Sequence, residues 1–197
     1  PLALILGPAD QLLKENSQLE ARERFRLTAI KRNAQSLLHQ VNDLLDLARI
    51  DALQMPMAYV CANVIALLRD VMATFAAAAE EKSITLLIEG PSELYADIDR
   101  AKLARVMANL VSNAFKFTPV GGRICCSITR VANRRFLLSV QDTGPGVPSQ
   151  MKDHIFSRFT QGQDGLSGGG SGLGLNIVKE FVELHFGTVV VLDALGG

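Results

Sequence analysis

Apolar residues recur at alternating intervals of three and four along the first 52 residues of the chain. The longer series comprises Leu27, Ile30, Ala34, Leu37, Val41, Leu44 and Ala48. The shorter series before it comprises Leu2, Ile5, Ala9 and Leu12. Because this spacing places apolar side chains on one face of a helix, residues 1–52 are predicted to form a helical hairpin with a polar break at 15–18. Pro8 is expected to kink or loosen the first helix.

Two helices alone cannot bury two wide apolar stripes, so this hairpin needs a partner. The simplest partner is a second copy of the chain, which would give a dimeric four-helix bundle. The alternative is that the stripes pack on the C-terminal part of the same chain. The heptad regularity favours the bundle.

From about residue 59 the pattern becomes a mixture of helical and alternating segments. The helices are expected over residues 63–82, 99–117, 149–154 and 173–186. The strands are expected over residues 84–89, 95–98, 123–131, 135–141 and 188–192. Asp99 is a suitable N-cap for the second of these helices, and Asn133 is placed at the turn between two paired strands. Helices interspersed with mainly antiparallel strands predict an α+β chain in which residues 53–197 form a two-layer α/β sandwich.

The composition excludes several classes of protein. The 197 residues are 48% hydrophobic, which excludes disorder, and 20 Lys and Arg balance 20 Asp and Glu, which argues against a nucleic-acid partner. The chain contains neither a signal peptide nor an apolar run of the roughly 20 residues that span a bilayer. Three cysteines, two of them adjacent at Cys125 and Cys126, make a disulfide framework or a metal site improbable. A cytoplasmic location is expected, which is compatible with membrane anchoring of a longer protein.

The first chemical signal lies on the helix that follows Asp99. Asn109, Asn113 and Lys116 are spaced i, i+4 and i+7 and therefore share one face. Amide oxygens suit a hard cation and an ammonium group suits phosphate, so this face could receive a metal-bound polyphosphate. An ordinary solvated helix face is the alternative.

The second signal is the segment Asp142–Pro148 (DTGPGVP), which follows an apolar strand. A carboxylate there can accept a hydrogen bond from an exocyclic amine, and glycines allow a flat ring to approach the backbone. The alternative is an Asx turn that caps the next helix.

The third signal is the glycine-rich segment Gly168–Leu175 (GGGSGLGL), which leads directly into a long helix. Its backbone N–H groups, together with the helix N-terminus, could bind an anion. The segment is neither a Walker A loop nor a dinucleotide fingerprint, and a flexible loop is the alternative.

Four segments occur in a specific order along the chain: Asn109–Thr118 (NLVSNAFKFT), Asp142–Pro148, Ile155–Gln161 (IFSRFTQ) and Gly168–Leu175. In this order they resemble the N, first glycine, F and second glycine boxes of sensor histidine kinases. The hairpin resembles the dimerisation and histidine-phosphotransfer domain of that family. The resemblance covers essentially the whole chain, and it implies domains at 1–52 and 53–197.

The resemblance also implies a role for each matching position in binding ATP and Mg²⁺. Asn113 would ligate Mg²⁺ with Asn109 beside it, and Lys116 would face the phosphates. Asp142 would accept a hydrogen bond from the adenine amine, and Arg158 would reach the γ-phosphate. Gly144 and Gly146 would shape the base pocket, and Phe156 and Phe159 would anchor a mobile lid. The other expected nucleotide-binding residues are Phe117 and, in the loop around the triphosphate, Gly170, Ser171, Gly172, Leu173 and Gly174.

Two departures from the family pattern are expected to matter. Only Pro1 and Leu2 match the end of the motif that carries the phosphoacceptor, so the acceptor histidine is expected before Pro1. We interpret His39 as solvent-exposed and both His154 and His185 as structural, with His185 at a helix C-terminus where a cation would suit the dipole. The last strand of the family's ATP-binding domain is expected to be missing.

Two functions are compatible with these residues. The first is a dimeric kinase core that transfers the γ-phosphoryl group of ATP to a histidine, for relay to an aspartate of a response-regulator receiver domain. The alternative is a non-catalytic nucleotide-binding module that regulates a partner kinase through the hairpin. Related hydrolases and serine or threonine kinases carry Glu where Asn109 stands. A neutral imidazole needs no such base, so Asn109 favours histidine as the acceptor.

Overall fold

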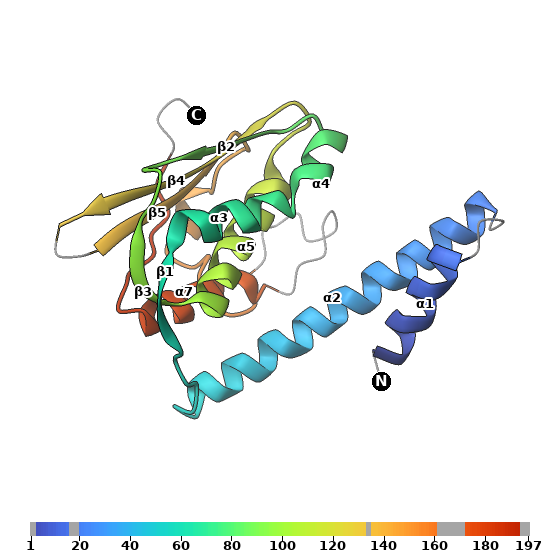
Figure 1. Ribbon diagram of the computed structural model, residues 1–197, viewed down its shortest axis with the longest axis horizontal. Coiled ribbons are helices and arrows are strands. Elements are labelled where there is room, and N and C mark those ends of the chain that lie inside the picture. The colour runs from blue at the N-terminus through green and yellow to red at the C-terminus, as the bar shows by residue number, and fades with distance from the viewer. Residues whose placement is uncertain (1–2, 16–19, 133–134, 161–171, 194–197) are drawn as a thin grey trace. The chain divides into compact units, whose positions relative to one another are not determined.

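The computed structural model describes residues 3–15, 20–132, 135–160 and 172–193. The chain divides into two compact units, Pro1–Met55 and Pro56–Gly197. Figure 1 identifies the elements of each unit, and the two are considered separately below. Among the described helices, none is both long and apolar enough to cross a membrane.

The first unit is a pair of helices, α1 (Ala3–Glu15) and α2 (Ala21–Asp51). A capping box at Glu20 and Glu23 begins α2, with the Glu20 amide donating to the Glu23 carboxylate at 3.3 Å. An ion pair of 2.5 Å between Lys31 and Asp10 joins the two helices. Helix α1 continues through Pro8, and the kink or loosening expected there stays a prediction. The predicted break between the helices falls largely on residues outside the described ranges.

The apolar seam of α2 has little cover. Ala34 is buried, whereas Ile30, Leu37, Val41 and Leu44 are each 40–49% exposed. The heptad pattern therefore predicted this helix correctly. In a single chain, its row of apolar side chains is about half exposed to solvent.

The second unit contains two small sheets. Strands β1 (Tyr59–Asn63) and β3 (Tyr95–Asp99) form an antiparallel pair. Strands β2 (Thr85–Glu89), β4 (Arg123–Val131) and β5 (Arg135–Asp142) form the other sheet in the order β2-β4-β5. The pair β4–β5 is antiparallel, but β2 and β4 are parallel, which the sequence pattern did not indicate.

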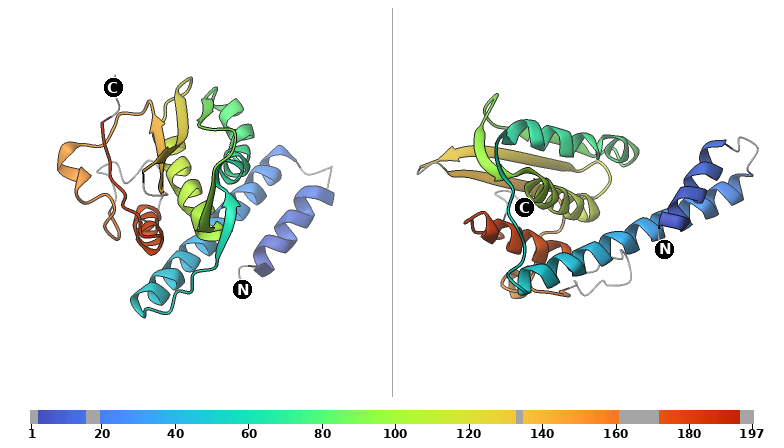
Figure 2. Two further views of the ribbon diagram at one scale, coloured as in Figure 1. Left: turned by 60° about the vertical axis from the view of Figure 1, so that its left-hand side comes forward. Right: turned by 60° about the horizontal axis from the view of Figure 1, so that its bottom comes forward.

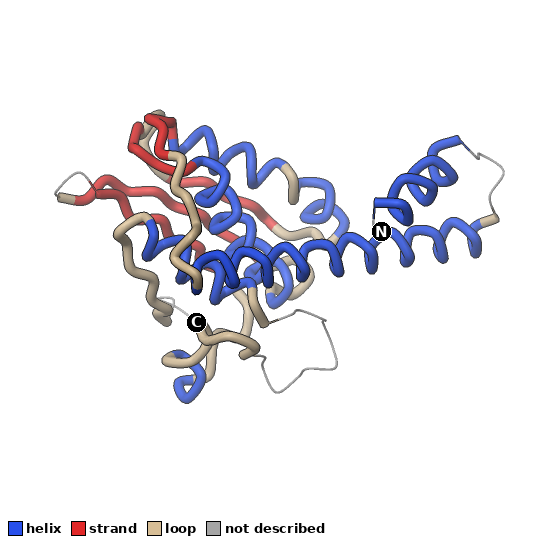
Figure 3. Tube along the Cα trace, turned by 90° about the horizontal axis from the view of Figure 1, so that it is seen from below, coloured by secondary structure: helices blue, strands red, loops and turns tan. Residues whose placement is uncertain are grey.

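The helices of this unit are α3 (Val64–Ala73), α4 (Ala76–Glu81), α5 (Arg100–Phe117), α6 (Ser149–Lys152) and α7 (Gly174–Leu184). Helix α5 is central, because it contacts α3, α7 and strands of both sheets (Figure 2). The short helix α6 stands between two loop segments (Figure 3). The apolar core of the unit includes Leu68, Val106, Met107, Val111, Ile124, Ile128, Ile177 and Phe181.

Two expectations for this unit are wrong in detail. The helix predicted over 63–82 is split into α3 and α4, because the chain turns at Thr74 and Phe75. The strand predicted over 188–192 does not form, because this part of the described chain has no strand beside it, and Val190 and Leu192 are 71% and 80% exposed. The turn assigned to Asn133 lies outside the described residues.

Candidate functional site

Helix α5 brings the predicted polar face to the start of α7. The Asp99 carboxylate caps the helix by accepting from the Lys102 amide at 3.1 Å. Asn109 is only 8% exposed, and its Nδ2 donates to the carbonyl of Gly174 at 3.2 Å. Asn113, one turn further, is half-buried, and Lys116 is exposed. An ordinary solvated face does not describe this arrangement, because Asn109 is buried in a contact between helices.

The end of β5 meets the C-terminal end of α5. Asp142 accepts a hydrogen bond from the Gly144 amide at 2.7 Å through Oδ1, so the Asx turn that was the alternative for this segment is present. A Cβ atom on Gly144 would lie 2.6 Å from that oxygen and 3.0 Å from the carbonyl oxygen of Phe117. Gly146 has a φ of +74°. The loop can pass this close to Phe117 only because position 144 has no side chain.

The F-box segment meets the first residues of the glycine-rich loop that are described. The Phe159 amide donates to the Gly172 carbonyl at 3.1 Å. Phe159 and Gly172 have φ values of +60° and +70°, and a Cβ on Gly172 would lie 2.9 Å from the Phe159 backbone. Two segments separated by 12 intervening residues (160–171) are therefore joined at one point.

The remaining predicted residues lie close in sequence to this junction. Leu173 is buried, Phe156 is half-buried, and Arg158 is exposed. Gly170 and Ser171 lie outside the described residues.

Two family models match the chain. The model of histidine kinase-, DNA gyrase B- and HSP90-like ATPases matches residues 98–197, and that of the His Kinase A (phospho-acceptor) domain matches residues 1–53. The chain belongs to the histidine kinase family. The ATPase model spans the segments of all four boxes, and the phospho-acceptor model spans the helical hairpin.

Similar proteins agree with this assignment. The sensor histidine kinase TmoS of Ectopseudomonas mendocina is 47% identical over 199 residues, which covers 100% of this chain and 20% of TmoS. Hybrid signal transduction histidine kinase D of Dictyostelium discoideum is 45% identical, over 97% of this chain and 13% of that protein. The solved structure of full-length ShkA in complex with AMPPNP matches with a TM-score of 0.78 and 32% identity, over 100% of this chain and 41% of that one. Because these relatives are kinases, they do not favour the alternative of a non-catalytic module.

Asn176 is a residue of this site that sequence reasoning missed. It is 5% exposed, and its Nδ2 donates to the Phe156 carbonyl at 3.0 Å, which ties α7 to the F box. Its Oδ1 is buried and has no hydrogen-bond partner among the described residues. The available signal was one amide in the otherwise apolar series Leu173, Ile177, Val178 and Phe181.

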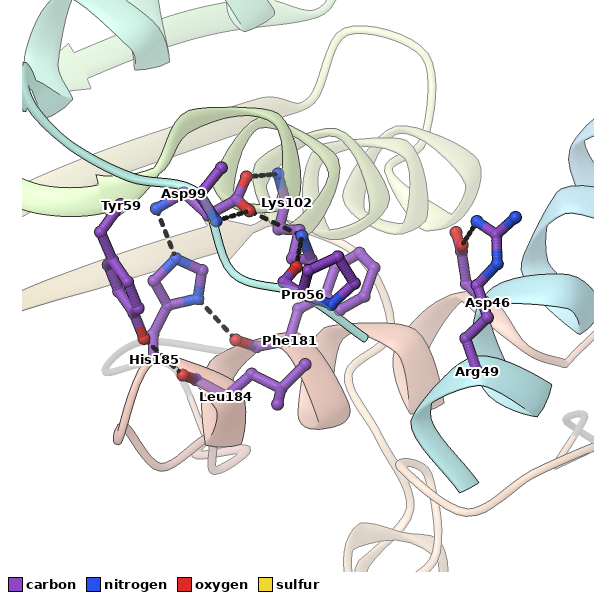
Figure 4. A network of polar contacts seen from close by, with 10 residues as sticks. Asp46, Arg49, Pro56, Tyr59, Asp99, Lys102, Phe181, Leu184 and His185 are labelled. Carbon is purple, nitrogen blue, oxygen red and sulfur yellow. Dashed lines mark hydrogen bonds and ion pairs between the residues drawn. The ribbon is translucent and has the colours of Figure 1, made fainter. Parts of the chain in front are cut away.

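A second polar cluster, also missed, lies at the N-terminus of α5 (Figure 4). The ammonium group of Lys102 lies 2.6 Å from Asp99 Oδ2, and the Ala58 amide donates to the same oxygen at 3.0 Å. Burial alone would raise the pKa of Asp99. The bonds from Lys102 and from the amides of Ala58 and Lys102 outweigh that effect and lower the pKa to about 2.

His185 belongs to this cluster as a structural residue, and its ring is not the cation that a helix C-terminus would suit. Its Nε2 lies 3.1 Å from the Asp99 backbone nitrogen, which can only donate, and its Nδ1 lies 2.6 Å from the Phe181 carbonyl oxygen. The ring must therefore be neutral, with its proton on Nδ1. The Tyr59 ring meets it edge-on at 5.8 Å. In the hairpin, the side chain of His39 is 57% exposed, as expected.

Proposed function

We propose that this chain is the core of a sensor histidine kinase, which binds Mg-ATP and transfers the γ-phosphoryl group to a histidine. One observation carries the proposal. Asn109 with Gly174, Phe117 with Gly144, and Phe159 with Gly172 are three contacts that unite the four boxes around α5 and α7.

The adenine end of the site is assigned to Asp142. Its Oδ1 is used by the Gly144 amide, and no hydrogen bond within the described chain occupies Oδ2. That oxygen can accept a hydrogen bond from the exocyclic amine of adenine. A Cβ atom on Gly146 would have no atom within 4 Å, so the backbone there is open to a flat base. Gly144 allows the loop to pass close to Phe117, which is 53% exposed and supplies apolar surface beside the base.

The phosphate end is assigned to Asn113, Lys116 and the start of α7. No described hydrogen bond engages the side chain of Asn113, so its oxygen is available as a neutral ligand for Mg²⁺. The described residues contain no cluster of three or more His, Cys, Asp or Glu that could hold a metal. A single amide ligand fits Mg²⁺ that is held chiefly by phosphates and water, and the bound ion would offset their negative charge. The positive N-terminus of α7, with Gly172 and Gly174, suits the phosphate oxygens, as do Lys116 and Arg158.

The transfer step needs positioning more than proton removal. A lone pair of a neutral imidazole forms the N–P bond as the bond from the γ-phosphorus to its bridging oxygen breaks, and ADP leaves with that electron pair. Asn109 cannot act as a base, and its Nδ2 instead holds Gly174. An aspartate of a response-regulator receiver domain would then accept the phosphoryl group.

Dimerisation is assigned to the hairpin. The apolar seam of α2 is half-exposed in a single chain, and a phospho-acceptor domain model matches the same residues. A second copy of the seam is the simplest cover for it.

The proposal is tested by nucleotide binding and by phosphate transfer. Asp142→Asn should weaken ATP binding by about 1.5–3 kcal/mol, the range for a bond to a charged group, whereas Asp97→Asn on the exposed edge of β3 should not. Asn113→Ala should weaken binding only when Mg²⁺ is present, and Ser112→Ala on the exposed face is its matched control. Calorimetric titration measures both pairs. Normal ATP affinity in both site variants would contradict the assignment.

Transfer itself is tested with labelled ATP. The chain of residues 1–197 should bind ATP and remain unlabelled, because none of its histidines, His39, His154 and His185, lies in a segment that resembles the acceptor motif. A chain that also contains the acceptor motif upstream of the hairpin should acquire an acid-labile, base-stable phosphate. Label on the chain of residues 1–197 that disappears in His39→Gln would contradict the placement of the acceptor.

A further inference from the structure

The end of α2 is fixed by its own backbone. The amides of Leu53 and Gln54 donate to the carbonyls of Ile50 and Arg49 at 2.8 and 2.9 Å, and Leu53 has a φ of +56°. This combination of two bonds and a left-handed residue is a Schellman motif. The hairpin therefore dictates the course of the chain as far as Gln54.

The first residues of the second unit are fixed by side chains. Lys102 Nζ donates to the Pro56 carbonyl at 2.8 Å and to Asp99 Oδ2 at 2.6 Å, and Asp99 Oδ2 also accepts from the Ala58 amide at 3.0 Å (Figure 4). We call Asp99 and Lys102, with these two backbone partners, the linker clasp. The Asp99 side chain is 4% exposed and that of Lys102 is 15% exposed, so water competes little for these bonds.

Met55 is the one residue between the Schellman motif and the linker clasp. The ring of Pro56 fixes its own φ, and it also restricts Met55 to extended conformations. The connection between the two units is therefore held by hydrogen bonds on both sides of Met55, at Gln54 and at Pro56.

We propose that Asp99 and Lys102 are positioning residues for histidine phosphorylation, because they confine the free chain between the hairpin and the ATP-binding unit to Met55. This inference rests on the proposed function. Neither residue touches the nucleotide in this scheme. They act by limiting how far the ATP-binding unit moves from the hairpin and from the acceptor expected upstream of it.

Opening the linker clasp would free residues 55–58, since the next restrained element is β1. Effective concentration falls as about the −3/2 power of linker length, so going from one free residue to four lowers it by roughly eightfold at most. The rate of phosphorylation should fall by up to this factor. ATP affinity should not change, because Asn113 lies about 17 Å further along α5 at 1.5 Å per residue.

The test uses the protein extended upstream through its acceptor histidine. Lys102→Met removes both clasp bonds from Nζ and keeps the aliphatic stem. Arg100→Met is the matched control, because Arg100 lies in the same helical turn as Lys102. The substitution breaks an ion pair between Arg100 and Asp70, whose side chains are 62% and 66% exposed. We expect Lys102→Met to lower kcat for histidine labelling by roughly two- to fivefold with KM for ATP unchanged, because the Ala58 amide keeps its bond to Asp99 and the free segment becomes residues 55–57. Lys102→Arg should restore part of the rate, and Arg100→Met should match the unmodified protein.

A second variant keeps the inference testable if Lys102→Met does not fold. Inserting two glycines after Met55 lengthens the free segment to three residues and leaves the linker clasp intact, so it should produce the same fall in kcat. A rate equal to or above that of the unmodified protein in the insertion variant would overturn the inference. A fall in kcat that is matched in Arg100→Met, or accompanied by lost ATP affinity, would also overturn it. Absence of histidine labelling in the unmodified protein would instead contradict the proposed function.

Discussion

The hairpin and the ATP-binding unit differ in how much of their apolar surface is buried within one chain. In the unit that begins at Pro56, Ile124, Ile128 and Ile177 are completely buried. In the hairpin, Leu37 and Leu44 on the predicted seam are each 49% exposed. The ATP-binding unit thus completes its core within one chain, whereas the hairpin presents a surface that is complete only with a partner.

The largest effect should come from charging the hairpin seam. Leu37→Lys with Leu44→Lys places four charged side chains in a dimer, and lost burial of about 1 kcal/mol per leucine weakens association by about 4 kcal/mol. Light scattering should show a monomer, and ATP titration should show an unchanged site. Arg24→Gln with Arg32→Gln serves as a charge control away from these two positions. A monomeric unmodified chain at high concentration would contradict the comparison.

A core truncation should have its main effect in the other unit. Ile128→Ala leaves a cavity in the sheet and should lower the free energy of unfolding by about 3 kcal/mol. Ile30→Ala, at a residue 49% exposed in the hairpin, should cost less than about 1 kcal/mol in the monomer. Both tyrosines, Tyr59 and Tyr95, lie in the ATP-binding unit, so tyrosine circular dichroism during denaturation follows that unit, and far-ultraviolet circular dichroism follows the helices of the hairpin. Equal losses from the two substitutions would remove the distinction between the units.

Acid should act on the ATP-binding unit through Asp99. Its pKa falls from the ordinary value of 3.8 to about 2 in the folded chain. A carboxyl group with a depressed pKa stabilises the fold above its unfolded pKa and loses that contribution as the pH falls through 3.8 towards 2. The loss should be on the order of 2 kcal/mol, at 1.36 kcal/mol per pKa unit. Denaturant unfolding across this pH range should show it, and Asp99→Asn should flatten this part of the profile.

Local sequence predicted those parts of the molecule that depend on local rules. Helical periodicity located α2 and α5, and the cap at Asp99 fixed where α5 begins. Motif order assembled the candidate site, although the direct contact between Asn109 and Gly174 joins residues 65 positions apart and could not be read from spacing. The neutral charge of His185 was missed for the same reason, since its Nε2 bonds to a backbone amide 86 positions away.

The other two errors arose because local sequence does not show which elements are neighbours in the fold. Residues 188–192 are rich in β-branched side chains, but a strand requires a neighbour, and none lies beside them in the described chain. The split between α3 and α4 has a similar origin, because the Ala-rich segment is helical by propensity on both sides of Phe75. The ring centroids of Phe75 and of Phe115 on α5 lie 6.1 Å apart, and this tertiary contact could not be predicted from the local sequence.

The smallest expected effect concerns the end of the hairpin. Leu53 adopts a φ of +56° although it is 95% exposed, so its side chain contributes no burial in return for the strained backbone. Leu53→Gly should remove a strain of about 1–2 kcal/mol, offset by about 0.5–1 kcal/mol for the greater freedom of glycine in the unfolded chain. The hairpin should therefore gain roughly 0.5 kcal/mol, measured by far-ultraviolet circular dichroism on thermal unfolding. Ala52→Gly, at the neighbouring position with a φ of −78°, relieves no strain and should destabilise the hairpin instead. The same sign of change in both variants would show that left-handed strain at Leu53 does not limit the stability of this helix end.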